Sequence, residues 1–397
     1  MNAITAITAM KGEPTELVET ASKLVPLLRS RSLWTDEHRR LSDDVVEALN
    51  ASGLLKMYAP SQYGGFESSA RTAVDVHAEL ARGNSSASFV VSVYALLNWM
   101  SGLWPDDVLD EVFATPNVKV CGTTAPSGTA TPVDGGYLFT GRWGFTSGFL
   151  HSDWKITAAI LEGGTATDMI VALIPSGEIE VVDDWRTIGL QGSGSVTTVT
   201  KDLFVPERRV IRTADNVQGQ CYSEANSAKP LYQVPIAVLS TAVSVGQLVG
   251  AGKYALESFL ERITDRGITY TNYAKQSEAP VTHLNVGEAA LLVEEAEARA
   301  HRFADYFDAK VAVNEQWSQD ERVRARVEIA RVGQLAKQAT DLLAAASGGS
   351  SLFLDVPIRR IQRDIDATLV HALLNPQTNI ELYGRTICGL EPNTYHL

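Results

Sequence analysis

Hydrophobic residues in the first hundred positions recur at the three- and four-residue spacing that places them on one face of a helix. The clearest segments are ELVETASKLVPLLRSRS (16–32), ARTAVDVHAELARG (70–83) and SSASFVVSVYALLNWMSGL (85–103). Between the first two, Ser42 followed by DDVVEAL predicts an N-cap with an acidic first turn, and Gly53 is expected to end that helix. The pattern predicts an N-terminal helical domain over residues 1–116.

From residue 118 to residue 212 the pattern changes to short segments that are rich in β-branched residues and alternate apolar with polar positions. The segments are VKVCGTTA, GGYLFTGRW, WKITAAILE, DMIVALIP, GEIEVVDDW and SVTTVTKDLFVP. Asp-Gly-Gly at 134–136 predicts a hairpin turn. We expect an antiparallel sheet, arranged as a barrel or a sandwich, in a middle β domain over residues 117–225.

Long segments with helical spacing return after residue 226. They are PIAVLSTAVSVGQLVGAGKYALESFLERI, VTHLNVGEAALLVEEAEARAHRFADYFDAKV, QDERVRARVEIARVGQLAKQATDLLAAAS and VPIRRIQRDIDATLVHALLN. Four segments with apolar stripes predict a C-terminal four-helix bundle over residues 226–397. Gly246, Gly250 and Gly252 permit a close approach between helices, which is often found at an oligomer interface.

The order of the three parts predicts an α+β chain with a cleft for a small ligand where the parts meet. The most apolar run, residues 234–252, is interrupted by Ser, Thr, Gln and Gly. Because a bilayer span needs roughly 20 apolar residues, we expect this run to be a buried helix.

Composition narrows the classes of partner. The net charge of −13 argues against binding to nucleic acid or to an anionic membrane surface. Cys121, Cys221 and Cys388 are too few and too far apart for a disulfide framework, so a reducing cytoplasm is expected. The N-terminal MNAITAITAMKGEP lacks the charged and apolar regions of a signal peptide.

Several catalytic motifs are missing from the sequence. It has no GxxxxGK[ST], no GxSxG and no metal-binding HExxH, and no metal is predicted. GSGSV at 192–196 lacks the third glycine of a dinucleotide fingerprint and is read as a turn. Instead, GRWGFTSGFLHSDW (141–154) gathers aromatic rings, hydroxyl groups and glycines, a set that suits a flat aromatic ligand.

Five segments in order resemble motifs of the acyl-CoA dehydrogenase superfamily. They are GLLKMYAPSQYGG (53–65), CGTTAPSGTA (121–130), GGYLFTGRWGFTSG (135–148), GLQGSGSVTTVTKDLFVPERRV (189–210) and RRIQRDI (359–365). The resemblance covers nearly the whole chain. It implies the fold of that family: an N-terminal helical domain, a middle β domain and a C-terminal four-helix bundle.

The departures from the family pattern concern its chemistry. The common dehydrogenases carry a catalytic glutamate soon after the Arg-Asp pair, but no glutamate lies between Asp364 and Glu381, and His371 stands in this region instead. Thr124 is followed by alanine where the family has an acidic residue. Together with GRWGFTSG and its downstream His151, these features resemble the branch of two-component flavin-dependent monooxygenases.

That resemblance implies reduced FAD or FMN as cofactor, dioxygen as co-substrate and a separate NAD(P)H flavin reductase as partner. It implies hydroxylation of an aromatic or heteroaromatic small molecule through a flavin hydroperoxide, by a homotetramer packed through its bundles. Three alternatives stay open: an N- or S-oxygenase of the same fold, an acyl-CoA dehydrogenase that uses Glu381 as its base, and a flavin-binding relative without activity.

The resemblance also implies roles for individual residues. Ser147 would touch the reactive nitrogen of the flavin and slow the loss of peroxide, unless it is an ordinary turn serine. His371 would deprotonate a phenol, indole or amine or protonate the peroxide, unless a neighbouring carbonyl satisfies it. The cofactor-binding candidates are Thr124, Thr129, Trp143, Phe145, Thr146, Ser147, Arg266, Gly348 and Gly349. The substrate-binding candidates are Tyr94, Asn98 and Trp99, with Trp104 beside them.

Overall fold

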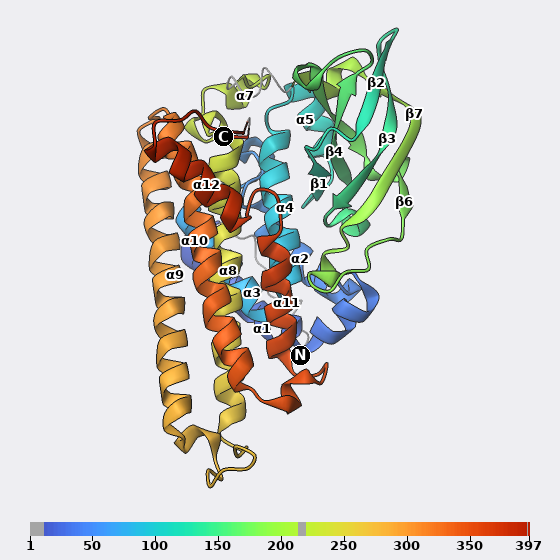
Figure 1. Cartoon of the computed structure of the whole chain (residues 1–397). Helices are drawn as coiled ribbons and strands as arrows, with labels where there is room; N and C mark the ends of the chain where they lie inside the picture. Colours follow the sequence, from blue (N-terminus) through green and yellow to red (C-terminus); the bar gives the residue numbers. More distant parts are fainter. Residues whose placement is uncertain (1–11, 213–219, 395) are drawn as a thin grey trace.

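The computed structural model describes residues 12–212, 220–394 and 396–397. Residues 1–11, which hold most of the segment considered above as a leader, lie outside the described part. Figure 1 shows a long helical body with a β domain against one side of its upper half. The long helices of the C-terminal half extend well below the β domain, so the bundle defines the long axis of the molecule.

Helices make up the N-terminal part, as predicted. They are α1 (Pro14–His38), α2 (Asp43–Ala51), α3 (Ala70–Gly83), α4 (Ser85–Ser101) and α5 (Asp106–Val112). Ser42 occupies the N-cap position of α2, but its hydroxyl donates to Asp44 Oδ1 over 2.5 Å instead of capping a backbone N–H. Gly53 follows α2 with a φ of 74°, the left-handed conformation that helps to end a helix.

Eight strands in the described part of the chain form one sheet. They are β1 (Val120–Thr123), β2 (Gly128–Val133), β3 (Gly136–Thr146), β4 (Trp154–Leu161), β5 (Met169–Pro175), β6 (Glu180–Val182), β7 (Val196–Pro206) and β8 (Val210–Arg212). Their order is β6-β7-β3-β2-β4-β5-β8, with β1 also on β4. The predicted hairpin turn at Asp134 joins β2 to β3. The sheet is mixed rather than antiparallel throughout, because β1 and β2 both pair with β4 in parallel.

The C-terminal part contains the predicted bundle. Its helices are α7 (Glu224–Ser227), α8 (Ile236–Ile263), α9 (Pro280–Ala312), α10 (Gln319–Ala346), α11 (Pro357–Leu369) and α12 (Pro376–Ile387). The fourth predicted segment stops earlier than expected, since α11 ends at Leu369 and α12 starts a new direction. α8 is the one described helix apolar and long enough to cross a membrane, and 83% of its most apolar window is buried inside the protein. It is therefore the buried helix that the sequence predicts.

The glycines of α8 pack inside the chain and not at an oligomer interface, which corrects the expectation drawn from them. A Cβ on Gly246 would lie 2.1 Å from the carbonyl oxygen of Val74, and one on Gly250 would lie 2.0 Å from that of Ala78. Both carbonyls belong to α3. The backbones of α3 and α8 therefore touch, and this contact joins the N-terminal helices to the bundle.

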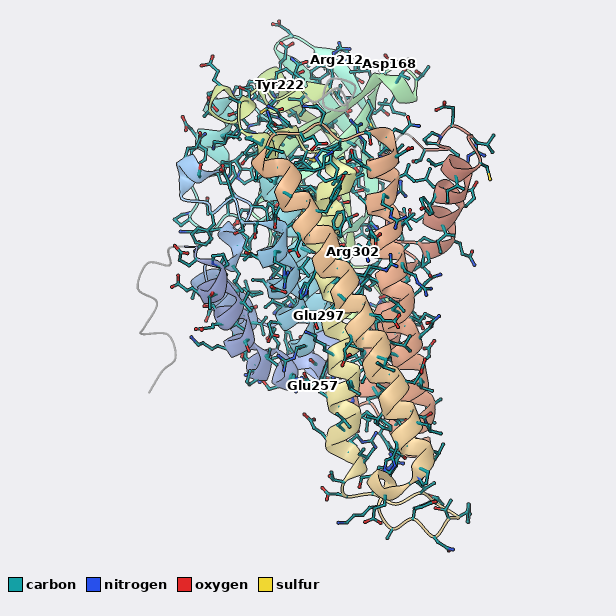
Figure 2. All side chains as sticks on the ribbon, turned by 90° about the vertical axis from the view of Figure 1, so that its left-hand side faces the viewer. Asp168, Arg212, Tyr222, Glu257, Glu297 and Arg302 are labelled. Carbon is teal, nitrogen blue, oxygen red and sulfur yellow. The ribbon has the colours of Figure 1, made fainter. Side chains whose placement is uncertain are left out.

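Ion pairs reinforce this junction at the surface. Figure 2 labels Glu257 on α8 and Glu297 on α9 along the same side of the bundle. Glu257 accepts hydrogen bonds from Arg82 over 2.8 Å and from Arg29, both in the N-terminal helices. Because these side chains are partly exposed, such pairs contribute about 1 kcal/mol or less each, and they mainly fix the orientation of the helices.

Candidate functional site

The site begins where β3 ends. The register between β3 and β7 shifts between Trp143 and Thr146, and Phe145 has a φ of 58°. Such a bulge redirects the side chains that follow it and is common beside functional sites. Ser147 lies immediately after the bulge, and its backbone N–H donates to the carbonyl of Phe145 over 3.0 Å.

The hydroxyl of Ser147 is the first of three serine hydroxyls in contact. Ser147 Oγ lies 2.7 Å from Ser195 Oγ, and Ser195 Oγ lies 2.7 Å from Ser193 Oγ. Ser193 Oγ in turn donates to the carbonyl of Leu190 over 2.7 Å. All three serines are buried, and Ser147 retains 8% exposure. We call Ser147, Ser195 and Ser193 the serine chain.

Tyr94 of α4 holds the turn that carries Ser147. Its hydroxyl donates to the carbonyl of Gly148 over 2.6 Å, and the N–H of Gly148 donates to the carbonyl of Ser193 over 2.9 Å. Gly148 has a φ of 75°, and a Cβ there would lie 2.9 Å from the Tyr94 ring. Tyr94 is buried in this position, so its geometry supports a role in placing Ser147 rather than in touching substrate.

Asn98 and Trp99 lie in the core. Asn98 donates to two backbone carbonyls, one of them that of Leu55 over 3.1 Å, and accepts from a backbone N–H. The indole of Trp99 donates to the carbonyl of Leu231 over 3.0 Å, and Trp104 is bonded to a backbone carbonyl in the same way. Their polar atoms are occupied by the protein itself. The prediction that they contact substrate has no support in this geometry.

Trp143 and Phe145, the two aromatic residues nearest the end of β3, differ sharply. Trp143 has no exposed surface, and its indole donates to the carbonyl of Ala158 over 2.7 Å inside the β domain. It therefore cannot form the predicted wall beside a cofactor. Phe145 is 75% exposed, with its ring edge-on to Trp185 at 5.9 Å between centroids. Phe145 is thus the aromatic residue of this segment that a ligand can reach.

The other predicted cofactor contacts in the β domain are spread out. Thr146 is fully buried, and its hydroxyl lies 3.2 Å from that of Thr198. Thr124 is half-buried in the loop that follows β1, and Thr129 is exposed on β2. Their roles toward a cofactor stay predictions.

His371 lies just beyond α11, not on the final helix as expected. Its ring is edge-on to Phe89 of α4, with 6.2 Å between centroids. The N–H of Leu373 donates to His371 Nδ1 over 3.3 Å, so Nδ1 is an acceptor and the proton of the neutral ring is on Nε2. The ring keeps accessible surface, yet burial lowers the pKa of His371 below its usual 6.5. At neutral pH the side chain therefore offers an Nε2–H donor.

The N-terminal part of α4 contacts both the segment that carries Ser193 and the ring of His371. A Cβ on Gly192, next to Ser193, would lie 3.1 Å from the Cβ of Ser86. Ser86 stands three residues before Phe89, so both point from the same side of α4. Segments far apart in sequence thus meet around this part of α4.

α11 anchors the serine chain through a buried carboxyl group. The N–H of Leu190 donates to Asp364 Oδ1 over 2.7 Å. Burial, with a contribution from the Asp36 carboxylate, raises the pKa of Asp364 to about 7. The segments GLQGSGS and RRIQRDI, noted above for their resemblance, therefore meet here.

The sequence reasoning missed Ser193, Ser195 and Asp364 as parts of the site. The two serines meet because Thr146 pairs with Val196 in the antiparallel β3–β7 ladder, which places their neighbours Ser147 and Ser195 together, and the sequence alone does not contain this register. No signal pointed to Asp364, since the contact depends on how α11 packs.

Arg266 and Gly348 come together at a different place. Arg266 Nη1 donates to the carbonyl of Ser347 over 2.6 Å, and Nη2 lies 2.8 Å from where a Cβ on Gly348 would be. Gly349 begins the following 3-10 turn. These residues belong to the loops at the lower end of the bundle, away from the β domain (Figure 1). The structure therefore separates them from Ser147 within one chain.

Glu381, the alternative base, lies on α12 and not in the turn that holds His371. It is exposed on α12 and accepts from Asn393 over 2.8 Å. With Arg326 and Val370, it lines a pocket of about 330 Å³ between α10, α12 and the C-terminal segment.

Comparison with known proteins identifies the family. The family models "Acyl-CoA dehydrogenase, N-terminal domain" and "Acyl-CoA dehydrogenase, C-terminal domain" match residues 19–102 and 242–376. The pigment production hydroxylase of Rhodococcus sp. (strain ATCC 21145) is 30% identical over 373 residues, covering 94% of this chain and 96% of that protein. The oxygenase component of the FADH(2)-dependent resorcinol hydroxylase of Rhizobium sp. (strain MTP-10005) is 28% identical over 392 residues, covering 95% of each.

A solved structure agrees with these relatives. XiaF from Streptomyces sp., in complex with FADH2 and glycerol, superposes with a TM-score of 0.90 at 30% identity and covers 97% of this chain and 98% of that one. The chain belongs to the acyl-CoA dehydrogenase superfamily, in its branch of two-component flavin-dependent monooxygenases. It is an oxygenase component that uses reduced flavin and dioxygen, which confirms the prediction from the sequence.

Proposed function

We propose that this oxygenase hydroxylates a small phenol- or indole-like substrate, with reduced flavin delivered by a separate NAD(P)H flavin reductase. The observation that carries the proposal is the state of His371, a neutral imidazole whose Nε2–H is a donor in the region where dehydrogenases place a carboxylate base. A donor suits the oxygen of a phenol, whereas it cannot take a proton from carbon. The name of the resorcinol hydroxylase supports the same substrate class.

The residues at the end of β3 fit a reduced flavin. Ser147 offers a buried hydroxyl, and Phe145 offers an exposed ring against which a flat ligand can lie. Reduced flavin, when bound, supplies the electrons that activate dioxygen. Ser147 would then hold the reactive edge of the ring system, Phe145 would exclude water, and His371 would orient the substrate through Nε2–H. This changes the predicted role of His371 from proton transfer to hydrogen-bond donation.

We further propose that the working form is a homotetramer. Arg266, Gly348 and Gly349 suit the phosphate groups of a flavin nucleotide, but they belong to loops at the lower end of the bundle, below the β domain whose strand β3 leads to Ser147 (Figure 1). Leu352 and Phe353, beside them, are 72% and 69% exposed, and clustered apolar surface of this kind is typical of a protein interface. A second protomer could therefore bring its Arg266 to the Ser147 of the first.

The test is anaerobic loading of the protein with reduced FAD, and separately with reduced FMN, followed by mixing with dioxygen and candidate substrates. Reoxidation slower than that of free flavin, with hydroxylated product from a phenol or indole, is the expected result. Product only from an amine or a thiophene would favour the N- or S-oxygenase alternative. Ser147→Ala should release more hydrogen peroxide per product, and an unchanged ratio would remove Ser147 from the reaction.

A further inference from the structure

The serine chain has a fixed direction. The carbonyl of Leu190 can only accept, so Ser193 must give it its one hydroxyl proton. The same carbonyl also accepts from the N–H of Ser193 over 3.0 Å and from the indole of Trp185 over 3.1 Å. This oxygen is therefore the acceptor end of the chain.

The donor in each of the other two hydrogen bonds can be assigned by starting from the Leu190 carbonyl. With its own proton used, Ser193 can only accept from Ser195, so Ser195 donates to it over 2.7 Å. Ser195 then has no proton left and accepts from Ser147 over 2.7 Å. Among the described residues, this is the single arrangement in which each of the three contacts contains a proton. It leaves Ser147 with its proton engaged and its lone pairs free to accept.

We propose that Ser193 and Ser195 are positioning residues that hold Ser147 as a hydrogen-bond acceptor and thereby make the site favour reduced over oxidised flavin. The inference rests on the proposed function, in which Ser147 meets the reactive nitrogen of the flavin. That nitrogen carries a proton in reduced flavin and is a bare acceptor in oxidised flavin. If Ser147 can only accept, it can bind the N–H of reduced flavin. Against oxidised flavin, the lone pairs of Ser147 Oγ would face the lone pair of the nitrogen, and no hydrogen bond could form.

The backbone fixes the chain in place. Leu190 has a φ of 51°, and its N–H is held by Asp364 on α11. Gly194, between Ser193 and Ser195, has a φ of 53°, and a Cβ there would lie 3.2 Å from the carbonyl of Arg39. The direction of the hydroxyl groups is therefore set by the fold before any ligand arrives. Such an arrangement would favour release of the flavin after it has been oxidised.

The test is the affinity of the purified full chain for oxidised and for reduced FAD, the latter measured without oxygen. Ser195→Ala frees the proton of Ser147, so oxidised FAD should bind about 3- to 10-fold more tightly, the effect of gaining one ordinary hydrogen bond. Affinity for reduced FAD should stay nearly constant, because Ser147 can still accept. We call the affinity for reduced FAD divided by the affinity for oxidised FAD the redox affinity ratio, or the ratio for short. A tenfold change in this ratio corresponds to about 30 mV in the reduction potential of the bound flavin, which gives a second readout.

Three further variants separate a directional effect from a loss of packing. Ser195→Thr keeps a hydroxyl and should keep the wild-type ratio. Ser193→Ala should change the ratio in the same direction as Ser195→Ala. Without the Ser193 hydroxyl, Ser195 can donate to Ser147, and the proton of Ser147 is then free. Ser258→Ala on α8 is the matched control, since this buried serine likewise donates to a backbone carbonyl, over 3.1 Å. It should leave the ratio unchanged.

The double variant Ser147→Ala/Ser195→Ala separates failure of the directional chain from failure of the proposed contact between Ser147 and flavin. Ser147→Ala alone should weaken binding of reduced FAD, and adding Ser195→Ala should then change nothing further. If Ser147→Ala lowers the ratio and Ser195→Ala does not, the directional chain is refuted while the proposed contact of Ser147 with flavin stands. If neither variant changes the ratio, that contact is itself refuted.

Discussion

Lys155 should destabilise the protein, and its replacement by methionine should make the fold more stable. This lysine is fully buried in β4, with its Nζ 4.5 Å from the centroid of the Trp143 ring. None of the described residues gives the amine a hydrogen bond. Burial lowers the pKa of Lys155 from 10.5 to about 7. Methionine is unbranched and of similar length, so it can occupy the same space without the polar group.

The size of the effect follows from the pKa. In the unfolded chain the amine is charged up to pH 10.5, whereas in the folded protein it is half neutral near pH 7. At pH 7.5 this difference costs about 4 kcal/mol of folding free energy, at about 1.4 kcal/mol for each pKa unit. At pH 7.5 the folded amine is mostly neutral, so its contact with the Trp143 ring offsets less than the roughly 0.5–2 kcal/mol of a full cation–π interaction. We therefore expect Lys155→Met to stabilise the protein by about 2–4 kcal/mol.

The assay is urea unfolding followed by tryptophan fluorescence at pH 7.5 and pH 9. The unfolded state binds more protons than the folded state in this window, so Lys155 makes the wild type more stable as pH rises, by up to about 1.4 kcal/mol per pH unit. The advantage of Lys155→Met should shrink accordingly. Lys201→Met on the exposed face of β7 is the control and should change stability by about 0.5 kcal/mol or less. Destabilisation by Lys155→Met, or an advantage that does not vary with pH, would refute the reasoning.

Three further predictions follow from the site and the helix junction. His371→Ala should lower kcat/KM about 3- to 10-fold, the loss of one ordinary hydrogen bond donated by Nε2–H to the substrate oxygen, and because the neutral and the protonated imidazole both carry Nε2–H, the pH profile of kcat/KM should be the same in the wild type and the variant; an acid limb that is present in the wild type and absent from the variant would contradict this role. In the wild type, the raised pKa of Asp364 should make the protein less stable as pH rises from about 4 to about 7, because the unfolded chain loses this proton first. Asp364→Asn keeps an acceptor for the N–H of Leu190 but cannot ionise, so this part of the pH dependence should be missing from its thermal unfolding. Gly250→Ala should cost about 1–3 kcal/mol by overpacking, whereas Gly384→Ala, with open space around it, should cost nothing in the same melts.

Much of the fold can be predicted from local patterns. Helical spacing, alternating strands and the turn at Asp134 are encoded in neighbouring residues, and all three are confirmed. The break after α11 could also have been found, because Asn375 before Pro376 is a strong helix start, and its side chain accepts from the N–H of Gln377 over 2.9 Å. That break is what places His371 in a turn.

Other features depend on contacts that no local pattern contains. The parallel pairing of β1 and β2 with β4 is a choice among strand orders, which the sequence of each strand leaves open. Alternation along β3 predicts that Trp143 and Phe145 share a face, but the bulge puts one in the core and the other at the surface. Ser147 could be predicted by resemblance. The direction of its hydroxyl could not, because it depends on the carbonyl of Leu190.

The touching backbones of α3 and α8 have a consequence for how the protein is made. α3 leaves the ribosome early, but α8 follows only after the whole β domain has been synthesised. During that interval the carbonyls of Val74 and Ala78 lack the glycines that will cover them. The β domain can fold first, as a unit inserted into a helical body that closes later. We therefore expect nascent chains that stop before α8 to recruit chaperones, and the amides of the α3–α8 seam to exchange hydrogen among the slowest in the finished protein.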